Sequence, residues 1–279
     1  MEVARSTKGI NLCQRKYALD LLSSAGLLGT KPVSTPMDST IKLHSASGPA
    51  YADLTGYRRM IGKLVYLTHT RPDLSYAVSH LSQFLDKPTV AHYNAAIRVL
   101  KYLKNEPGKG VFFPASSSDK VQGFSDSNWA SCVDTRRSVT GYCFFIGDSL
   151  ICWKSKRQRT VSRSSAEAEY RALSLAGYEA QWLTYLFADL KLQHYKPISL
   201  FCDNQSALHI AANPVFHERT KHIEIDCHSI REKVQAGIVH LLPVRSAHQL
   251  ADVFTKPLAS GPFHLNISKL GMCNIHLPA

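Results

Sequence analysis

The stretch "SRSSAEAEYRAL" (Ser162–Leu173) carries two glutamates, Glu167 and Glu169, separated by one residue at the start of an expected helix. If Ser164 caps this helix, Glu167 completes a capping box, in which the glutamate bonds back to the backbone N–H of the cap. Steps of three and four residues from Glu169 lead only to apolar side chains, namely Leu173, Ala176, Ala180, Leu183 and Phe187. We therefore predict that Glu169 faces a core and that Glu167 serves the helix end.

A carboxylate that faces a core is costly unless it is paired, protonated or bound to a metal, so Glu169 is a candidate site residue. Three aspartates occupy comparable positions. Asp126 lies in "GFSDSNWA", Asp203 ends an expected strand in "ISLFCDNQSAL", and Asp252 lies in "SAHQLADVFTKPL". Each aspartate taken alone fits a turn or a helix cap better than a site. Only the set of four favours a shared function.

Four acids on four elements of one domain repel one another unless cations lie between them. Oxygen ligands of this kind select Mg²⁺ or Mn²⁺. Two such ions ~4 Å apart activate a water and stabilise the leaving oxygen in phosphodiester hydrolysis. The acids therefore indicate a two-ion site that acts on a phosphodiester.

The composition agrees with a folded protein that has a polyanionic partner. The chain has 279 residues, of which 44% are hydrophobic and 19% charged, so it can form two domains of ordinary size. A net charge of +12 favours binding to phosphates. We find neither an apolar run of the ~18 residues that a membrane helix needs nor a signal peptide. The sequence thus predicts an intracellular protein, cytoplasmic or nuclear, with no membrane association.

Two periodicities divide the chain. After a hairpin in "MEVARSTKGINLCQ", apolar residues repeat at helical spacing from residue 14 to about 105. From Val121 the pattern changes to three short strands, a long helix over 165–190, and then alternating strands and helices. We therefore expect a small, mainly helical unit over 1–113 and, over 121–273, a mixed α/β sheet with helices on its faces.

The second half resembles the ribonuclease H domain of Ty1/copia-type retrotransposon polyproteins, especially plant members. The match spans about Val121 to Cys273 and rests on markers in the family's order: "GFSDSNWA", "RRSVTGYCFFIG", "ICWKSKRQRTVSRSSAEAEYRAL", "FCDNQSAL", "RTKHIEIDCHSIRE" and "QLADVFTKPL". Carried over position by position, the family's metal-binding acids fall on Asp126, Glu169, Asp203 and Asp252.

The resemblance implies a five-stranded mixed sheet, with three antiparallel strands followed by two parallel ones, and no small-molecule cofactor. The implied activity is Mg²⁺- or Mn²⁺-dependent cleavage of the RNA strand of an RNA–DNA hybrid. The first half resembles the end of a copia reverse transcriptase, from the primer-grip hairpin through the thumb and connection. The fingers, the palm and the Y-x-D-D signature would lie upstream of Met1, so we do not expect an intact reverse transcriptase.

A basic run without any acid joins the third strand to the helix of Glu169: Lys154, Lys156, Arg157, Arg159 and Arg163. A solvated loop and a phosphate-binding loop explain this run equally well, and salt sensitivity would mark the second. A different cluster, His217, His222, Cys227 and His228, has spacings that fit no common zinc module.

The last expected helix starts near Ser246, where Ser246 and Gln249 form a second capping-box signature, and it ends at Pro257. On such a helix His248 would share a face with Asp252 and could help product to leave. Copia members usually have no histidine there, so the resemblance does not support this auxiliary role.

The rival hypothesis is a catalytically silent nucleic-acid-binding remnant of a retrotransposon polyprotein, motivated by the missing polymerase palm. The presence of all four acids argues against inactivation by ligand loss.

Overall fold

The computed structural model describes residues 1–192, 197–212 and 224–276. Two compact units are present. The first comprises Met1–Ser117, Asp148–Leu150 and Lys256–Ala279, and the second comprises Ser118–Gly147 and Ile151–Thr255. The sequence placed residues up to 273 in the second part, whereas the structure groups the final segment with the first. His217, His222 and the side chain of Cys227 lie outside the described residues.

The second unit contains the expected five-stranded mixed sheet, in the order β6-β5-β4-β7-β8. Its strands are β4 (Val121–Asn128), β5 (Val139–Ile146), β6 (Ser149–Arg157), β7 (Ile198–Cys202) and β8 (Val239–Pro243), and only the first two residues of β6 are grouped with the first unit. β4 is antiparallel to β5, whereas β7 runs parallel to both β4 and β8. β6 follows β5 after a turn of two residues, and only an antiparallel pair allows so short a connection. The implied ribonuclease H-like sheet is therefore confirmed.

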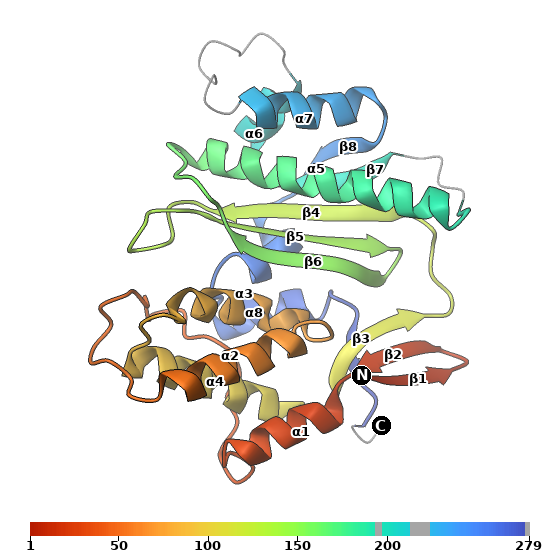
Figure 1. Ribbon diagram of the computed structural model, residues 1–279. Helices are drawn as coiled ribbons and strands as arrows, with labels where there is room; N and C mark the ends of the chain where they lie inside the picture. Colours follow the sequence, from red (N-terminus) through yellow and green to blue (C-terminus); the bar gives the residue numbers. More distant parts are fainter. Residues whose placement is uncertain (193–196, 213–223, 277–279) are drawn as a thin grey trace. The chain divides into compact units, whose positions relative to one another are not determined.

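The long helix α5 (Ser165–Asp189) packs along the sheet against β4, and α7 (Glu224–Gln235) packs on α5 (Figure 1). The short helix α6 (Gln205–Ala212) follows β7 and also contacts α5. The apolar face that the sequence predicted for α5 is buried in the core with residues of β4, β5 and β7. This packing sets how close Glu169 lies to the sheet.

The first unit opens with the expected hairpin, β1 (Glu2–Ser6) and β2 (Gly9–Cys13). Ser6 pairs with Gly9, so the turn contains two residues. Gly9 has a φ of +148°, and a Cβ there would lie 2.1 Å from the carbonyl oxygen of Phe113. Only glycine fits this close approach of two backbones.

A four-stranded antiparallel sheet in the first unit was not predicted from the sequence, where only the hairpin and helices were expected. The strand order is β1-β2-β3-β9, with β3 over Lys109–Pro114 and β9 over Met272–Asn274. β3 lies at the expected domain boundary, and β9 has three residues, which is too short for a period-2 pattern to be recognised.

The helices of the first unit up to residue 105 begin and end close to the segments with helical periodicity, whereas the helix over 260–267 was not predicted from the sequence. They are α1 (Arg15–Ser24), α2 (Leu54–Leu67), η1 (Pro72–Leu74), α3 (Ser75–Leu81), η2 (Ser82–Phe84), α4 (Val90–Asn105) and α8 (Ser260–Ile267). Tyr57, Ile61 and Leu64 of α2 follow helical spacing and are almost fully buried. Among the described residues, none of the helices combines the length and hydrophobicity that crossing a bilayer requires.

A buried ion pair at the start of η1 contacts α4 through Tyr102. Arg71 donates to Asp73 through Nε at 3.0 Å and Nη2 at 2.7 Å, and both side chains are almost inaccessible to solvent. The Tyr102 hydroxyl donates to Asp73 at 2.7 Å, and Arg71 also donates to the carbonyl of Glu106 at 2.9 Å. Burial acts to raise the pKa of Asp73, but the charge and hydrogen bonds of Arg71 outweigh it and lower that pKa.

We expect Asp73→Asn to lower the free energy of unfolding by about 3–5 kcal/mol at pH 7, because it leaves Arg71 buried without its counter-charge. The loss should shrink as the pH falls, since Asp73 contributes above its unfolded pKa and ceases to contribute when protonated. Urea denaturation at several pH values measures both effects. Asp86→Asn is the control, because Asp86 is 88% exposed and lies 3.7 Å from Arg58. Similar losses in the two variants would contradict the interpretation.

Candidate active site

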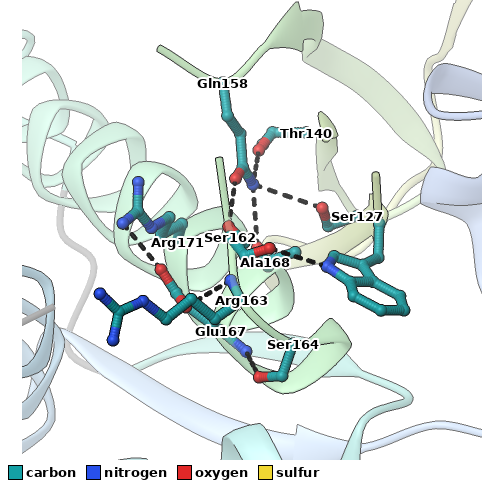
Figure 2. A network of polar contacts seen from close by, with 10 residues as sticks. Ser127, Thr140, Gln158, Ser162, Arg163, Ser164, Glu167, Ala168 and Arg171 are labelled. Carbon is teal, nitrogen blue, oxygen red and sulfur yellow. Dashed lines mark hydrogen bonds and ion pairs between the residues drawn. The ribbon is translucent and has the colours of Figure 1, made fainter. Parts of the chain in front are cut away.

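The start of α5 contains both glutamates of the stretch Ser162–Leu173. Ser164 accepts the N–H of Glu167 at 3.1 Å, as predicted. The carboxylate of Glu167 accepts the N–H of Arg163 at 2.8 Å and pairs with Arg171 at 2.8 Å (Figure 2). In the expected capping box Glu167 would accept the N–H of the cap residue, Ser164. In the structure it accepts the N–H of Arg163, the residue before the cap. Glu167 is 4% exposed and Glu169 is 6% exposed, so both glutamates are buried, although only Glu169 was predicted to face a core.

Glu169 reaches the part of β4 that extends past β7 and has no strand partner on that side. β4 pairs with β7 only over Gln122–Phe124, so the next residues of β4 extend past the end of β7. Ser125 and Ser127 direct their backbone groups to the same side, because strand residues alternate. Glu169 Oε1 accepts the N–H of Ser127 at 3.0 Å, and Gln249 Nε2 donates to the carbonyl of Ser125 at 2.9 Å. Two side chains thus take the place of a neighbouring strand.

Asp126 lies between these two serines and is 3% exposed. Its Oδ2 accepts a hydrogen bond from Thr255 Oγ1, and the same hydroxyl lies 3.2 Å from the backbone oxygen of Asp252. Asp252 belongs to η6 (Leu250–Phe254), which approaches β5 at Gly141, the partner of Asp126 in the sheet register. A Cβ on Gly141 would lie 2.7 Å from the Thr255 side chain. The glycine therefore permits the approach that brings Asp252 towards Asp126.

Asp203 follows the last residue of β7 and lies near Glu169. Ligand atoms of Glu169, Cys202 and Asp203 are all within 4.8 Å of one another. Burial, and then the negative charge of Glu169, raise the pKa of the Cys202 thiol, and Asp203 and Asp126 act in the same direction. The thiol stays protonated and donates to Glu169 Oε2 at 3.9 Å. Ser246 donates to Asp203 Oδ2 at 2.8 Å.

The structure links the four predicted acids through shared partners at one end of the sheet, although among the described residues only Glu169 and Asp203 of the four belong to a group whose ligand atoms all lie within 4.8 Å of one another. Glu169 and Asp203 lie close together, Ser127 links Glu169 to the strand of Asp126, and Thr255 links Asp126 to Asp252. The four acids come from β4, α5, η6 and the residue after β7. Oxygen donors grouped in this way suit a hard divalent cation.

The basic run divides into an exposed part and a partly buried residue. Lys154, Lys156, Arg159 and Arg163 are exposed. Arg157 is partly buried, and its Nη1 lies 3.8 Å from Cys132 Sγ, so it contributes to local packing. The run is therefore not uniform, although the sequence predicted no difference among its members.

The expected helix from Ser246 to Pro257 is not formed. Two short 3₁₀ turns, η5 (Ser246–His248) and η6, are separated by Gln249, whose ψ of 100° leaves the helical region. Gln249 uses its side chain to cap Ala251 and to bind β4, which explains the break. His248 is exposed and does not share a continuous helix face with Asp252, so the geometric argument for its auxiliary role was wrong.

Three residues around the acids were not predicted from the sequence. Ser127 and Thr255 bind the carboxylates of Glu169 and Asp126, and Gln158 is buried beside them. No pattern in the sequence marks hydroxyl and amide side chains of this kind, because their partners are distant along the chain. The only signal was the position of Gln158 between an expected strand and the helix of Glu169.

Comparisons with known proteins decide the family. No protein-family model matches the chain. The retrovirus-related Pol polyprotein of transposon RE2 from Arabidopsis thaliana is 43% identical over 275 residues, which cover 99% of this chain and 19% of that protein. The corresponding polyprotein of transposon TNT 1-94 from Nicotiana tabacum is 34% identical and covers 96% of this chain and 21% of that protein. The chain belongs to the copia-type Pol polyproteins.

This Pol chain spans about a fifth of the length of those curated relatives. Solved ribonucleases H align with about half of it. Ribonuclease H1 from Halobacterium salinarum is 16% identical, with a TM-score of 0.37, over 49% of this chain and 94% of that chain. LC11-RNase H1, in a complex with an RNA/DNA hybrid, is 15% identical, with a TM-score of 0.36, over the same shares.

We expect Thr255→Val to lower the free energy of unfolding by about 1.5–3 kcal/mol, because it removes a buried hydrogen bond to a carboxylate and keeps the side-chain shape. Thr255 is fully buried. Thr184→Val is the matched control, since the Thr184 hydroxyl donates to the carbonyl of Ala180 within its own helix, at 2.9 Å. Chemical denaturation compares the two variants, and equal losses would show that the hydrogen bond to Asp126 adds nothing.

Proposed function

We propose that the second unit is a metal-dependent endonuclease that cleaves the RNA strand of RNA–DNA hybrids. The observation that supports this most strongly is the grouping of Glu169 and Asp203 at the end of the five-stranded sheet, to which Asp126 and Asp252 are linked through Ser127 and Thr255. Membership of the copia-type Pol family agrees with it. The four acids are proposed as both the metal ligands and the catalytic residues.

The proposed donor set fits Mg²⁺ or Mn²⁺. All four proposed ligands are carboxylates, and hard oxygen donors of this kind are the ligands that these ions prefer. Two bound ions would supply an activated water and stabilise the departing 3′ oxygen. The chain itself orients the acids through the Ser127 N–H and the Thr255 hydroxyl. Such outer hydrogen bonds fix the direction of a ligating carboxylate.

The exposed part of the basic run is proposed to contact the phosphates of the hybrid. Arg159 and Arg163 are exposed in the segment between β6 and α5, which leads directly to Glu169. Trp129, which is 48% exposed, donates from Nε1 to the carbonyl of Ser162 at 3.0 Å and so anchors the same segment. Phosphate contacts would hold the hybrid, and contacts to the 2′-hydroxyl would distinguish RNA from DNA.

Asp203→Asn should abolish cleavage while leaving the fold and hybrid binding largely intact, because it weakens a proposed ligand without opening a cavity. The measurement is cleavage of a labelled RNA–DNA hybrid in Mg²⁺ or Mn²⁺, with EDTA as a second control. Glu169→Gln should behave like Asp203→Asn. Glu167→Gln should retain activity because Glu167 serves the start of the helix and pairs with Arg171. Equal cleavage by Asp203→Asn and the unchanged protein would refute the proposal.

The same assay tests the rival function, a silent nucleic-acid-binding remnant. A folded protein that prefers the hybrid to duplex DNA, and cuts neither, would support that rival. The exposed basic residues beside the site are the observation that favours binding even without turnover.

The double substitution Arg159→Ala with Arg163→Ala should weaken hybrid binding at low salt. The slope of log K against log [salt] should become less steep by about 2, roughly one for each phosphate that is no longer bound. Titrations at several salt concentrations measure this slope. Lys120→Ala is the control, because Lys120 is exposed at the opposite end of β4 from Asp126. An unchanged slope in the double variant would identify the segment as a solvated loop.

A further inference from the structure

A buried glutamine, Gln158, lies between the strand β6 and the helix α5 that carries Glu169. It is 6% exposed and immediately follows the last residue of β6. Its backbone N–H donates to the carbonyl of Ser138 at 2.8 Å, so the main chain is fixed before the side chain turns inward. A buried amide is costly unless its hydrogen bonds are made.

The Gln158 amide nitrogen meets three acceptors on three different elements (Figure 2). It donates to Ser127 Oγ of β4 at 3.3 Å, to Thr140 Oγ1 of β5 at 3.0 Å and to the carbonyl oxygen of Ala168 in α5 at 3.0 Å. The NH₂ group has two hydrogens, so these acceptors share them. One side chain thus joins two strands to the first turn of the helix.

Two of these acceptors stand next to proposed metal ligands. Ser127 follows Asp126 directly, and its backbone N–H bonds Glu169 Oε1. Ala168 directly precedes Glu169. The separation of the two acids therefore depends on the distance that the Gln158 amide sets between Ser127 and Ala168.

The oxygen of the same amide holds the basic segment. Ser162 Oγ donates to Gln158 Oε1 at 3.0 Å, and the carbonyl of Ser162 accepts the Trp129 indole N–H at 3.0 Å. Arg159 and Arg163 flank this segment. The amide therefore connects the proposed phosphate-binding residues to the acids.

We propose that Gln158 is a positioning residue that sets the spacing of Asp126 and Glu169 and thereby their affinity for divalent ions. The inference rests on the proposed function for the identity of the ligands. Within the part of the chain that the structure describes, the Gln158 side chain bonds to the neighbours of the acids, so it acts through Ser127 and Ala168.

The test is Gln158→Met in the full chain, because methionine matches the length and volume of glutamine and lacks its hydrogen bonds. Mn²⁺ binding is measured from the loss of the free-ion electron paramagnetic resonance signal, independently of cleavage. We expect binding to weaken by about tenfold or more, the range found when outer partners of metal ligands are removed. In cleavage assays kcat should fall, and the KM for the hybrid should rise as well, because the bond that holds Ser162 between Arg159 and Arg163 is lost.

Gln14→Met is the matched control. Gln14 is a buried glutamine of the first unit, 3% exposed, whose amide donates to the carbonyl of Tyr66 at 3.2 Å and to Thr70 Oγ1 at 3.1 Å. It should lose stability without any change in Mn²⁺ affinity. Ser162→Ala removes one bond from Gln158 and should give an intermediate effect.

The outcomes separate the inference from the proposed function. A folded Gln158→Met protein that binds Mn²⁺ like the unchanged protein would overturn the inference, whatever the cleavage result. Weakened Mn²⁺ binding in a protein that never cuts hybrid would support the inference and overturn the proposed function. If the wild-type protein binds no Mn²⁺, both the inference and the proposed function are overturned.

Discussion

The hydrogen bond from the Ser127 backbone N–H to Glu169 is the contact on which the site depends. It exists because β4 extends past β7 and leaves backbone groups without a strand partner. Buried backbone donors and acceptors must be paired, so the chain has to supply side chains at this edge. Glu169 satisfies the donor of Ser127, and Gln249 satisfies the carbonyl of Ser125. The hydrogen bond that satisfies the unpaired end of β4 is therefore also the one that places Glu169 beside the strand of Asp126.

Gathering carboxylates opposes folding, because two like charges ~4 Å apart repel by about 4 kcal/mol at an effective dielectric constant of ~20. Hydrogen-bond donors offset part of this cost. Thr255 donates to Asp126, Ser246 to Asp203 and the protonated thiol of Cys202 to Glu169. The donors come from residues that are otherwise neutral, so no basic side chain among these contacts competes with a cation for the acids. Such an arrangement stabilises the apo fold and leaves the charge of the site for an ion.

Helical periodicity was enough to predict the orientation of Glu169, because α5 is long and its apolar face is continuous. The same reasoning failed around Asp252. There the capping-box signature of Ser246 and Gln249 suggested one helix, but Gln249 is drawn into binding β4 and the segment becomes two 3₁₀ turns. Propensity is a local property, whereas this bond spans 124 positions of the chain. Strand β9 was not predicted for a related reason. Its three residues form a strand only because they pair with β3, which is distant in the sequence.

Two neutral amides act on β4, Gln158 through the hydroxyl of Ser127 and Gln249 through the carbonyl of Ser125. An amide provides a hydrogen-bond donor and an acceptor on one rigid group. It can therefore connect an element that offers an acceptor to one that offers a donor. A lysine or arginine in either place would donate equally well, but its charge would attract the carboxylates and weaken their hold on a cation. A carboxylate would add to the repulsion. Glutamine is therefore the side chain that fixes the acids in space without altering the charge that the proposed metal site requires.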